Sequence, residues 1–135
     1  MEEKNLIICD TDVLIEYWNS DSSRYQESKR IIEDKIQLDN VIISAITKME
    51  LLMGASDKDE MKMISLKLQR FHTALINDNI TQQAMELFEK YRLSHGMAIP
   101  DCFIAATAIV TQLKLFTYNV KDFRFIENLD LFNNI

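Results

Sequence analysis

The sequence predicts a three-layer α/β/α sandwich built on a central, mainly parallel sheet of four to five strands. Short, continuously apolar runs alternate with longer amphipathic segments along the whole chain. Such runs are typical of strands covered on both faces, and their alternation with helices is typical of βαβ units. Only two glycines and one proline occur among the 135 residues, which leaves little room for flexible linkers. We therefore expect residues 1–135 to form a single domain.

The first half of the chain predicts two buried strands, because residues 6–9 and 41–43 are short apolar runs. Ser22 and Ser23 are residue types that cap helices, so the second helix is expected to begin there. The helices expected in this half cover residues 13–18, 22–38, 46–55 and 57–71.

The second half predicts further βα alternation. A weak strand is expected at 74–76, followed by a helix that Thr81 caps and that ends near Gly96. Pro100 and Asp101 then begin an apolar helix that continues over residues 102–113. The remaining strands are expected at 115–117 and, at an edge of the sheet, at 130–132.

Acidic side chains gather where this topology places ligands, beyond the carboxyl ends of parallel strands. Asp10 directly follows the first strand, and Glu50 lies in the first turns of the helix after the second. The helix that begins at Asp101 runs antiparallel to the strand it feeds, so its first residues reach the same edge. Asn119 follows the fourth strand, with Asp122 just beyond it. The sequence thus predicts a carboxylate-rich site at one edge of the sheet.

Clustered carboxylates favour a divalent cation, since without one their mutual repulsion raises their pKa values. Mg²⁺ and Mn²⁺ prefer hard oxygen ligands, and they acidify water and neutralise charge on phosphoryl groups. Each acid also has a purely structural interpretation. Asp10, Asp12 and Asp101 suit the positive ends of helices, and Asp122 suits a solvated loop. Thr47 and Glu50 have the spacing of a capping box.

Four segments stand out, in order along nearly the whole chain: CDTDVLI at 9–15, TKMELLMGA at 47–55, IPDCFIAATA at 99–108 and LFTYNVKDF at 115–123. Together they resemble PIN-domain proteins, and among them the VapC-type toxins of toxin–antitoxin pairs. The resemblance implies an α/β/α fold and a Mg²⁺- or Mn²⁺-dependent endoribonuclease, a hydrolase that cuts RNA phosphodiester bonds with metal-activated water.

Carried over position by position, the resemblance makes Asp10, Glu50 and Asp101 the principal metal-site acids. Asn119 matches a fourth position that is Asp in some members and Asn in others. As a neutral amide it cannot supply charge, and Asp122 is the candidate substitute.

Two further pairs of residues are candidates for supporting roles at this edge. The hydroxyls of Thr11 and Thr117 are candidates for supporting the acids. Lys121 and Arg124 follow the fourth strand closely and are candidates for contacting RNA phosphates. The net charge of −6 argues against broad electrostatic binding of nucleic acid, so such contacts would be local.

The resemblance also implies a homodimer and a cognate antitoxin that has a DNA-binding end and a toxin-wrapping tail. Tyr17, Trp18 and Tyr25 are candidates for lining an apolar groove that receives such a tail. The alternative is that they pack in the core or in the dimer.

The chain is expected in the reducing cytoplasm, because its cysteines lie in apolar runs and suit buried thiols. We expect no signal peptide in its first residues, and the apolar run that follows is too short to span a membrane.

Two other functions remain open at this point. Residues 6–13 also resemble the start of haloacid-dehalogenase-type phosphatases, in which Asp10 would be the nucleophile and Asp12 a general acid. That interpretation leaves Glu50 and Asp101 without a role. The second alternative is a catalytically inactive PIN-like module that binds RNA or another partner, which the neutral Asn119 would suit.

Overall fold

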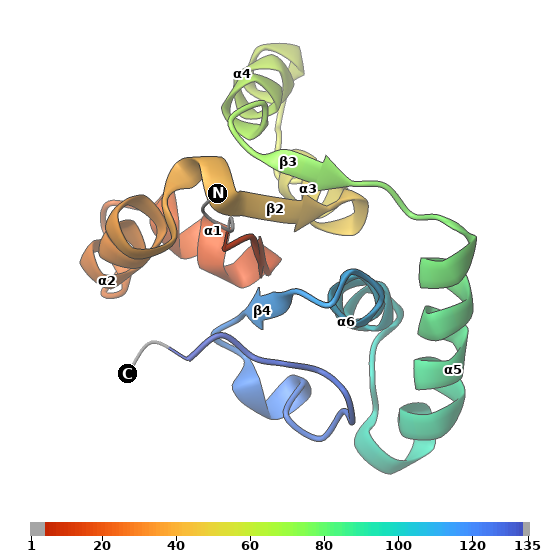
Figure 1. Ribbon diagram of the computed structural model, residues 1–135. Coiled ribbons are helices and arrows are strands. Elements are labelled where there is room, and N and C mark those ends of the chain that lie inside the picture. The colour runs from red at the N-terminus through yellow and green to blue at the C-terminus, as the bar shows by residue number, and fades with distance from the viewer. Residues whose placement is uncertain (1–4, 134–135) are drawn as a thin grey trace.

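The central sheet has four parallel strands in the computed structural model, which describes residues 5–133. Their order is β3-β2-β1-β4, so the chain starts in the middle of the sheet and builds outward in both directions (Figure 1). This confirms the predicted parallel α/β/α architecture. The strands are β1 (Ile7–Cys9), β2 (Val41–Ser44), β3 (His72–Ala74) and β4 (Lys114–Phe116).

Side chains of the central strands alternate between two separate hydrophobic cores. In β1, Ile8 joins one core, whereas Ile7 and Cys9 join the other. In β4, Leu115 and Phe116 divide in the same way. Successive side chains of a strand point to opposite faces, so a continuously apolar strand needs cover on both sides. The short apolar runs of the sequence therefore specify three layers.

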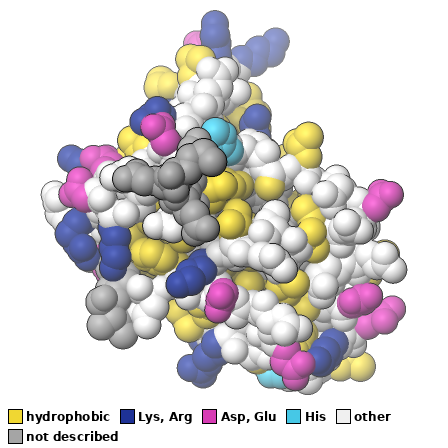
Figure 2. Space-filling model, in the orientation of Figure 1, with side chains coloured by type: hydrophobic (Ala, Val, Ile, Leu, Met, Phe, Trp, Pro, Cys, Tyr) yellow, Lys and Arg dark blue, Asp and Glu magenta, His cyan; other side chains and the backbone are white. Residues whose placement is uncertain are grey.

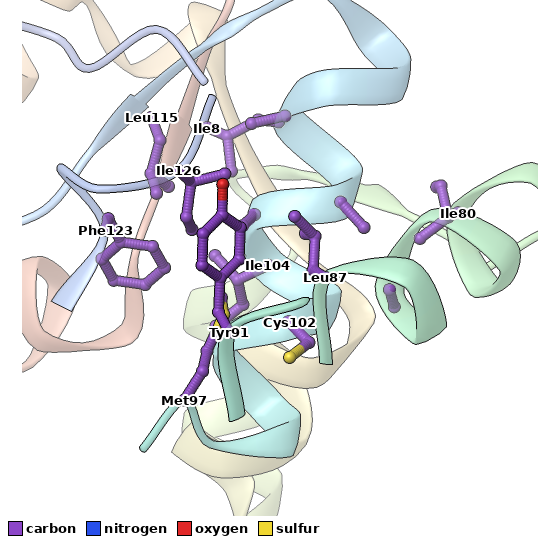
Figure 3. Packing of buried hydrophobic residues seen from close by; sticks show 14 residues of the cluster. Ile8, Ile80, Leu87, Tyr91, Met97, Cys102, Ile104, Leu115, Phe123 and Ile126 are labelled. Carbon is purple, nitrogen blue, oxygen red and sulfur yellow. The ribbon is translucent and has the colours of Figure 1, made fainter. Parts of the chain in front are cut away.

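One face of the sheet is covered by α5 (Asp78–His95) and α6 (Ile99–Thr111). Most of α6 is buried, because its alanines let it lie close to the sheet and to α5. In Figure 3, Tyr91 stands between Ile126, Ile104 and Leu87, and its hydroxyl accepts a hydrogen bond from the Glu127 amide at 3.3 Å. This core fixes the position at which α6 begins.

The other face is covered by α1 (Thr11–Tyr17), α2 (Tyr25–Lys29) and a π-helix, η1 (Arg30–Ile36) (Figure 1). Two further helices, α3 (Ala45–Leu52) and α4 (Lys58–Leu68), complete this core with Leu51 and Leu68. The helix predicted from residue 57 starts there, because the Asp57 side chain caps α4 by accepting from the Glu60 amide.

The predicted helix at 22–38 is wrong in its start, its form and its end. The helix begins at Tyr25 without a side-chain cap, and the Ser22 hydroxyl accepts instead from the Arg24 amide within the preceding turn. From Arg30 the helix widens into the π form, whose i to i+5 repeat suits the burial of Ile31 and Ile36. Gln37, at φ 76°, ends it.

Other element boundaries also differ from prediction. The third strand lies at His72–Ala74, two residues before its predicted position. It is a half-exposed edge strand whose place is set by pairing of His72 with Ile42 of β2, so the apolar residues of the sequence do not mark it. Asn77, not Thr81, caps α5. The fifth strand is reduced to a single bridge between Leu131 and Leu115. Short 3₁₀ turns occur at η2 (Leu38–Asn40) and η3 (Val120–Asp122).

Both cysteines, Cys9 and Cys102, are buried free thiols, as predicted. Burial raises the pKa of each thiol, so neither is an activated nucleophile. Within residues 5–133, no helix combines the length and apolarity needed to cross a membrane.

Candidate metal-binding active site

Asp10 lies where β1 leaves the sheet, and its position follows from the strand register. Because Cys9 pairs with Phe116, the next residues, Asp10 and Thr117, leave the two strands side by side. The Thr117 hydroxyl donates to Asp10 Oδ2 at 2.8 Å, and the Thr11 amide donates to Asp10 Oδ1 at 2.8 Å. Asp10 is only 5% exposed and also caps α1. Its helix-capping role and its place at the sheet edge therefore coexist.

Glu50 is joined to this edge by a hydroxyl from α1. The Thr11 hydroxyl donates to Glu50 Oε1 at 2.7 Å and lies 3.0 Å from the Thr47 hydroxyl. Since Thr11 has one hydroxyl proton and the carboxylate can only accept, Thr47 serves as the donor to Thr11. The capping-box interpretation is wrong, because Ser44 caps α3 and Thr47 is buried inside it. Thr47, which the sequence left as a cap, is instead a support for Glu50.

Asp101 reaches the same edge from the first turn of α6, as the antiparallel course of that helix requires. Burial, and after it the charges of Asp122, Glu50 and Asp12, raise the pKa of Asp101, so these carboxylates lie around it. Asn119 contributes differently. Its side chain is exposed, and its backbone amide donates to the Thr117 hydroxyl at 3.0 Å. Of the two candidates for the fourth position, Asp122 is thus the one whose charge reaches Asp101.

Asp12 also lies at this acidic edge, since its charge acts on both Asp10 and Asp101, whereas the sequence predicts it only as a helix start or, in the phosphatase alternative, as a general acid. Its Oδ2 accepts from the Tyr118 amide at 3.1 Å, which ties α1 to the loop after β4. Its Oδ1 is buried and has no hydrogen-bond partner among the described residues. The signal was present in the sequence, since Asp12 is the second acid of an Asp-x-Asp pattern directly after a strand.

The acids perturb one another strongly. Burial, followed by the Asp12 charge, raises the pKa of Asp10 to about 7, against the lowering effect of its hydrogen bonds. Burial, followed by Asp122, raises the pKa of Asp101 to about 6. Burial also raises the pKa of Asp12, against the lowering effect of the hydrogen bond that it accepts from the Tyr118 amide. Ionisation of all these acids at once is therefore unfavourable in the folded protein.

The donor set fits a hard divalent cation. It consists of carboxylate oxygens, one of them a buried orphan on Asp12, in a group whose repulsion a positive charge would relieve. As they stand, no three His, Cys, Asp or Glu side chains within residues 5–133 converge on one point closely enough to hold an ion. Thr11 and Thr117 hold Glu50 and Asp10 in their present orientations, so binding requires at least one carboxylate to rotate.

Lys121 and Arg124 are both exposed, in and just after η3. Arg124 is tied to this turn through its backbone amide, which donates to the Val120 carbonyl at 2.8 Å. Their side chains are thus placed beside Asp122 in sequence and remain candidates for contacting a polyanion.

Thr117→Val is expected to lower activity at this site about tenfold, because it removes the donor to Asp10 and the acceptor for the Asn119 amide. Loss of that donor also raises the pKa of Asp10 further, so the acid limb of the pH–rate profile should move to higher pH. Thr117→Ser keeps the hydroxyl and should restore both. An unchanged profile in the valine variant would show that Thr117 only packs.

The fold and the acidic edge together define an α/β/α protein whose site is formed by residues from the ends of separate strands and helices. The chain belongs to the PIN domain family, whose model matches residues 7–127. This membership excludes the alternative assignment to haloacid-dehalogenase-type phosphatases.

Relatives of known name share nearly the full length. The chain is 28% identical over 132 residues to Ribonuclease VapC1 of Methanocaldococcus jannaschii, covering 96% of this chain and 88% of that protein. It resembles a chain of a toxin–antitoxin complex from Klebsiella pneumoniae, with 27% identity, a TM-score of 0.72 and coverage of 91% and 94%. A chain of the DNA-bound VapBC2 complex from Rickettsia felis shares the fold, with 23% identity, a TM-score of 0.73 and coverage of 96% and 99%.

Proposed function

We propose that this protein is a divalent-metal-dependent endoribonuclease and the toxin of a toxin–antitoxin pair. The observation that carries the proposal is the gathering of Asp10, Asp12, Glu50, Asp101 and Asp122 at one sheet edge, with raised pKa values at Asp10 and Asp101. The names of the relatives support both parts of the proposal, since one is a ribonuclease and another comes from a toxin–antitoxin complex.

Asp10, Glu50 and Asp101 would hold the cation, Mg²⁺ or Mn²⁺, with Asp12 Oδ1 as a further candidate ligand. When bound, such an ion would supply positive charge to the phosphodiester and acidify water. Thr117 orients Asp10, and Thr11 orients Glu50. Because Asp10 is nearly buried while Asp101 is half-buried, the outer end of the site at Asp101 is the side from which RNA would approach.

The test is cleavage of end-labelled structured RNAs by the purified protein with Mg²⁺ or Mn²⁺, with and without a chelator. Cleavage that the chelator abolishes supports the proposal. Binding of RNA without cleavage under any metal would favour the inactive PIN-like module instead, and Asn119 would then be the first position to examine.

We further propose Asp122, rather than Asn119, as the fourth residue of the site. Asp122→Asn is expected to lower the cleavage rate on the order of tenfold or more, since it removes a charge that acts on Asp101. Asn119→Ala keeps the backbone donor to Thr117 and should cost much less. The comparison is a single-turnover rate at saturating Mg²⁺, and the reverse ranking would assign the position to Asn119.

The antitoxin site that we propose is a hollow of about 400 Å³ formed by α1, α2 and the end of α4. The three predicted aromatic residues, Tyr17, Trp18 and Tyr25, all line it. Lys67 Nζ lies 5.2 Å from the centre of the Trp18 ring, and Arg70, which is paired with Asp39, adds a second cation at the wall. Aromatic lining with flanking cations suits an amphipathic segment that carries acidic residues.

Trp18→Ala is expected to weaken binding of the co-expressed cognate antitoxin at least about tenfold, since buried aromatic anchors dominate such interfaces. Trp18→Phe keeps an aromatic ring and should lose far less. The measurement is the affinity of the refolded toxin variants for the antitoxin, determined by calorimetry. As the control, the rate of RNA cleavage by Trp18→Ala should equal that of wild type. Equal affinity for wild type and the alanine variant would exclude this hollow as the antitoxin site.

The homodimer and the cytoplasmic location also stay proposals. The buried free thiols support a reducing compartment. For the second copy, the best candidate surface is an apolar hollow of about 260 Å³ between α5 and α6, where Met85 and Ile99 are more than half exposed. The molar mass in solution, measured by light scattering, tests this proposal.

A further inference from the structure

Arg24 is placed beside the acidic site by contacts that the mechanism above does not use. Its guanidinium carbon lies 4.2 Å from the centre of the Tyr118 ring. Tyr118 stands between Thr117 and Asn119, and its amide donates to Asp12. A cation from the start of α2 is therefore seated on a residue of the active-site loop, although 94 positions separate the two in sequence.

The ring under Arg24 is held firmly. The Tyr118 hydroxyl is 2.7 Å from the hydroxyl of Ser28, which is completely buried. Phe116 contacts the ring edge-on, with centroids 5.3 Å apart and an interplanar angle of 78°. Together with the amide bond to Asp12, these contacts fix both ends of the tyrosine. Arg24 thus rests on a preorganised platform.

A guanidinium stacked on an aromatic ring keeps its in-plane N–H groups available, and these match a phosphate in a bidentate manner. Among the described residues, the ion pairs within 4 Å join Arg70 to Asp39 and Lys90 to Glu127. Glu27 acts on Tyr118 from nearby, but it forms no such pair with Arg24. The donors of Arg24 are therefore not engaged by a carboxylate of this part of the chain.

We propose that Arg24 binds a backbone phosphate of the RNA substrate next to the cleaved bond, with Tyr118 as its platform. The inference rests on the proposed ribonuclease function and adds a substrate-positioning residue to it. The net charge of −6 offers RNA no broad electrostatic attraction, so individually placed cations matter more. Figure 2 shows acidic and basic side chains interspersed on the face that it presents, not a broad basic surface. A few fixed cations must then guide a polyanion to an acidic site.

The test measures binding of a short fluorescein-labelled single-stranded RNA by anisotropy over a series of salt concentrations. The protein carries Asp101→Asn, so that Mg²⁺ can be present without cleavage. Adding Arg24→Gln should weaken binding about tenfold and reduce the slope of log affinity against log salt by about one. Folding should be kept, because the Arg24 side chain makes no hydrogen bond at the start of α2.

Two further variants separate a placed contact from a general effect of charge. Arg30→Gln removes an equal charge from an exposed position in η1 and should change affinity by less than about twofold. Tyr118→Leu keeps Arg24 but removes its platform, and should weaken binding nearly as much as Arg24→Gln. In the protein with an intact site, Arg24→Gln should raise KM and leave kcat within about threefold.

Equal losses in Arg24→Gln and Arg30→Gln, or an unchanged salt slope, would overturn the inference. So would loss of antitoxin binding with full RNA affinity in Arg24→Gln, which would assign Arg24 to the partner surface. Cleavage of RNA by the wild-type protein is measured first and tests the proposed function separately. If the wild-type protein does not cleave RNA, the proposed function itself is contradicted.

Discussion

Replacing Asp10 or Asp101 with asparagine is expected to lower the rate of RNA cleavage on the order of a hundredfold or more. Both substitutions keep the size of the side chain and remove a charge from the acidic edge. Asp10→Asn should preserve the fold, since its amide oxygen can accept from Thr11 and its NH₂ group can donate to the Thr117 hydroxyl. The loss would therefore report on the site rather than on unfolding.

The matched control is Asp21→Asn, which removes the same charge from an exposed position in the turn between α1 and α2. Its rate should stay within about twofold of wild type. Rates are measured in single turnover at several Mg²⁺ and Mn²⁺ concentrations, so that weaker metal binding is separated from slower chemistry. If the asparagine variants cleave as fast as the control, the acidic edge is not the active site.

Expression in a bacterial host gives an independent readout of the same variants. A ribonuclease toxin should arrest growth when induced, and both asparagine variants should remove the arrest. Arrest that persists in Asp101→Asn at an equal protein level would mean that toxicity does not depend on this site.

The position of the site could be predicted from the sequence because it depends on topology more than on detail. Parallel strands end at a common edge, and any residue one place beyond β1 or β4 reaches it. The errors at β3, at Thr81 and at the second helix did not matter, since none of them shifts that edge. The prediction of Asp10 and Asp101 thus needed only the order of the strands and the direction of α6.

The supports of the site could not be predicted, because they depend on contacts between residues far apart in sequence. Thr11 orients Glu50 across 39 positions, and Tyr118 contacts Ser28 across 90. Local patterns instead favoured a capping box for Thr47 and Glu50, which the Ser44 cap excludes. Similarly, an Asp in the first turn of a helix is so common that Asp12 carried little information until its orphaned oxygen was located.

The free energy of unfolding of the metal-free protein is expected to fall as the pH rises from about 5 to 8. In the folded state, Asp10 has a pKa of about 7 and Asp101 one of about 6, both above the ordinary aspartate value of 3.8. Between the unfolded and folded values, the folded protein binds more protons than the unfolded chain, so stability decreases with pH. The contribution is complete below about pH 4 and is lost as the pH passes through 6 to 7.

Asp10→Asn removes the ionisable group with the larger pKa shift, and so removes the largest part of the stability that wild type loses as the pH rises. In the presence of a chelator at pH 8, the variant should melt roughly 5–10 °C above wild type, and the gap should narrow toward pH 5. Asp21→Asn should follow wild type at both pH values. Mg²⁺ should raise the melting temperature of wild type at pH 8 but not that of Asp10→Asn, because the cation binds the ionised acids.

The cleavage rate and the melting temperature of Asp10→Asn together connect the stability of the fold to its proposed chemistry. A variant that is inactive yet more stable without metal would show that the protein keeps its acids together at a cost in stability that only a bound cation offsets. If wild type and Asp10→Asn instead melt in parallel across this pH range, burial and the neighbouring acids do not disfavour the ionised form of Asp10 in the folded protein. The case for a cation at this edge would then lose its electrostatic basis.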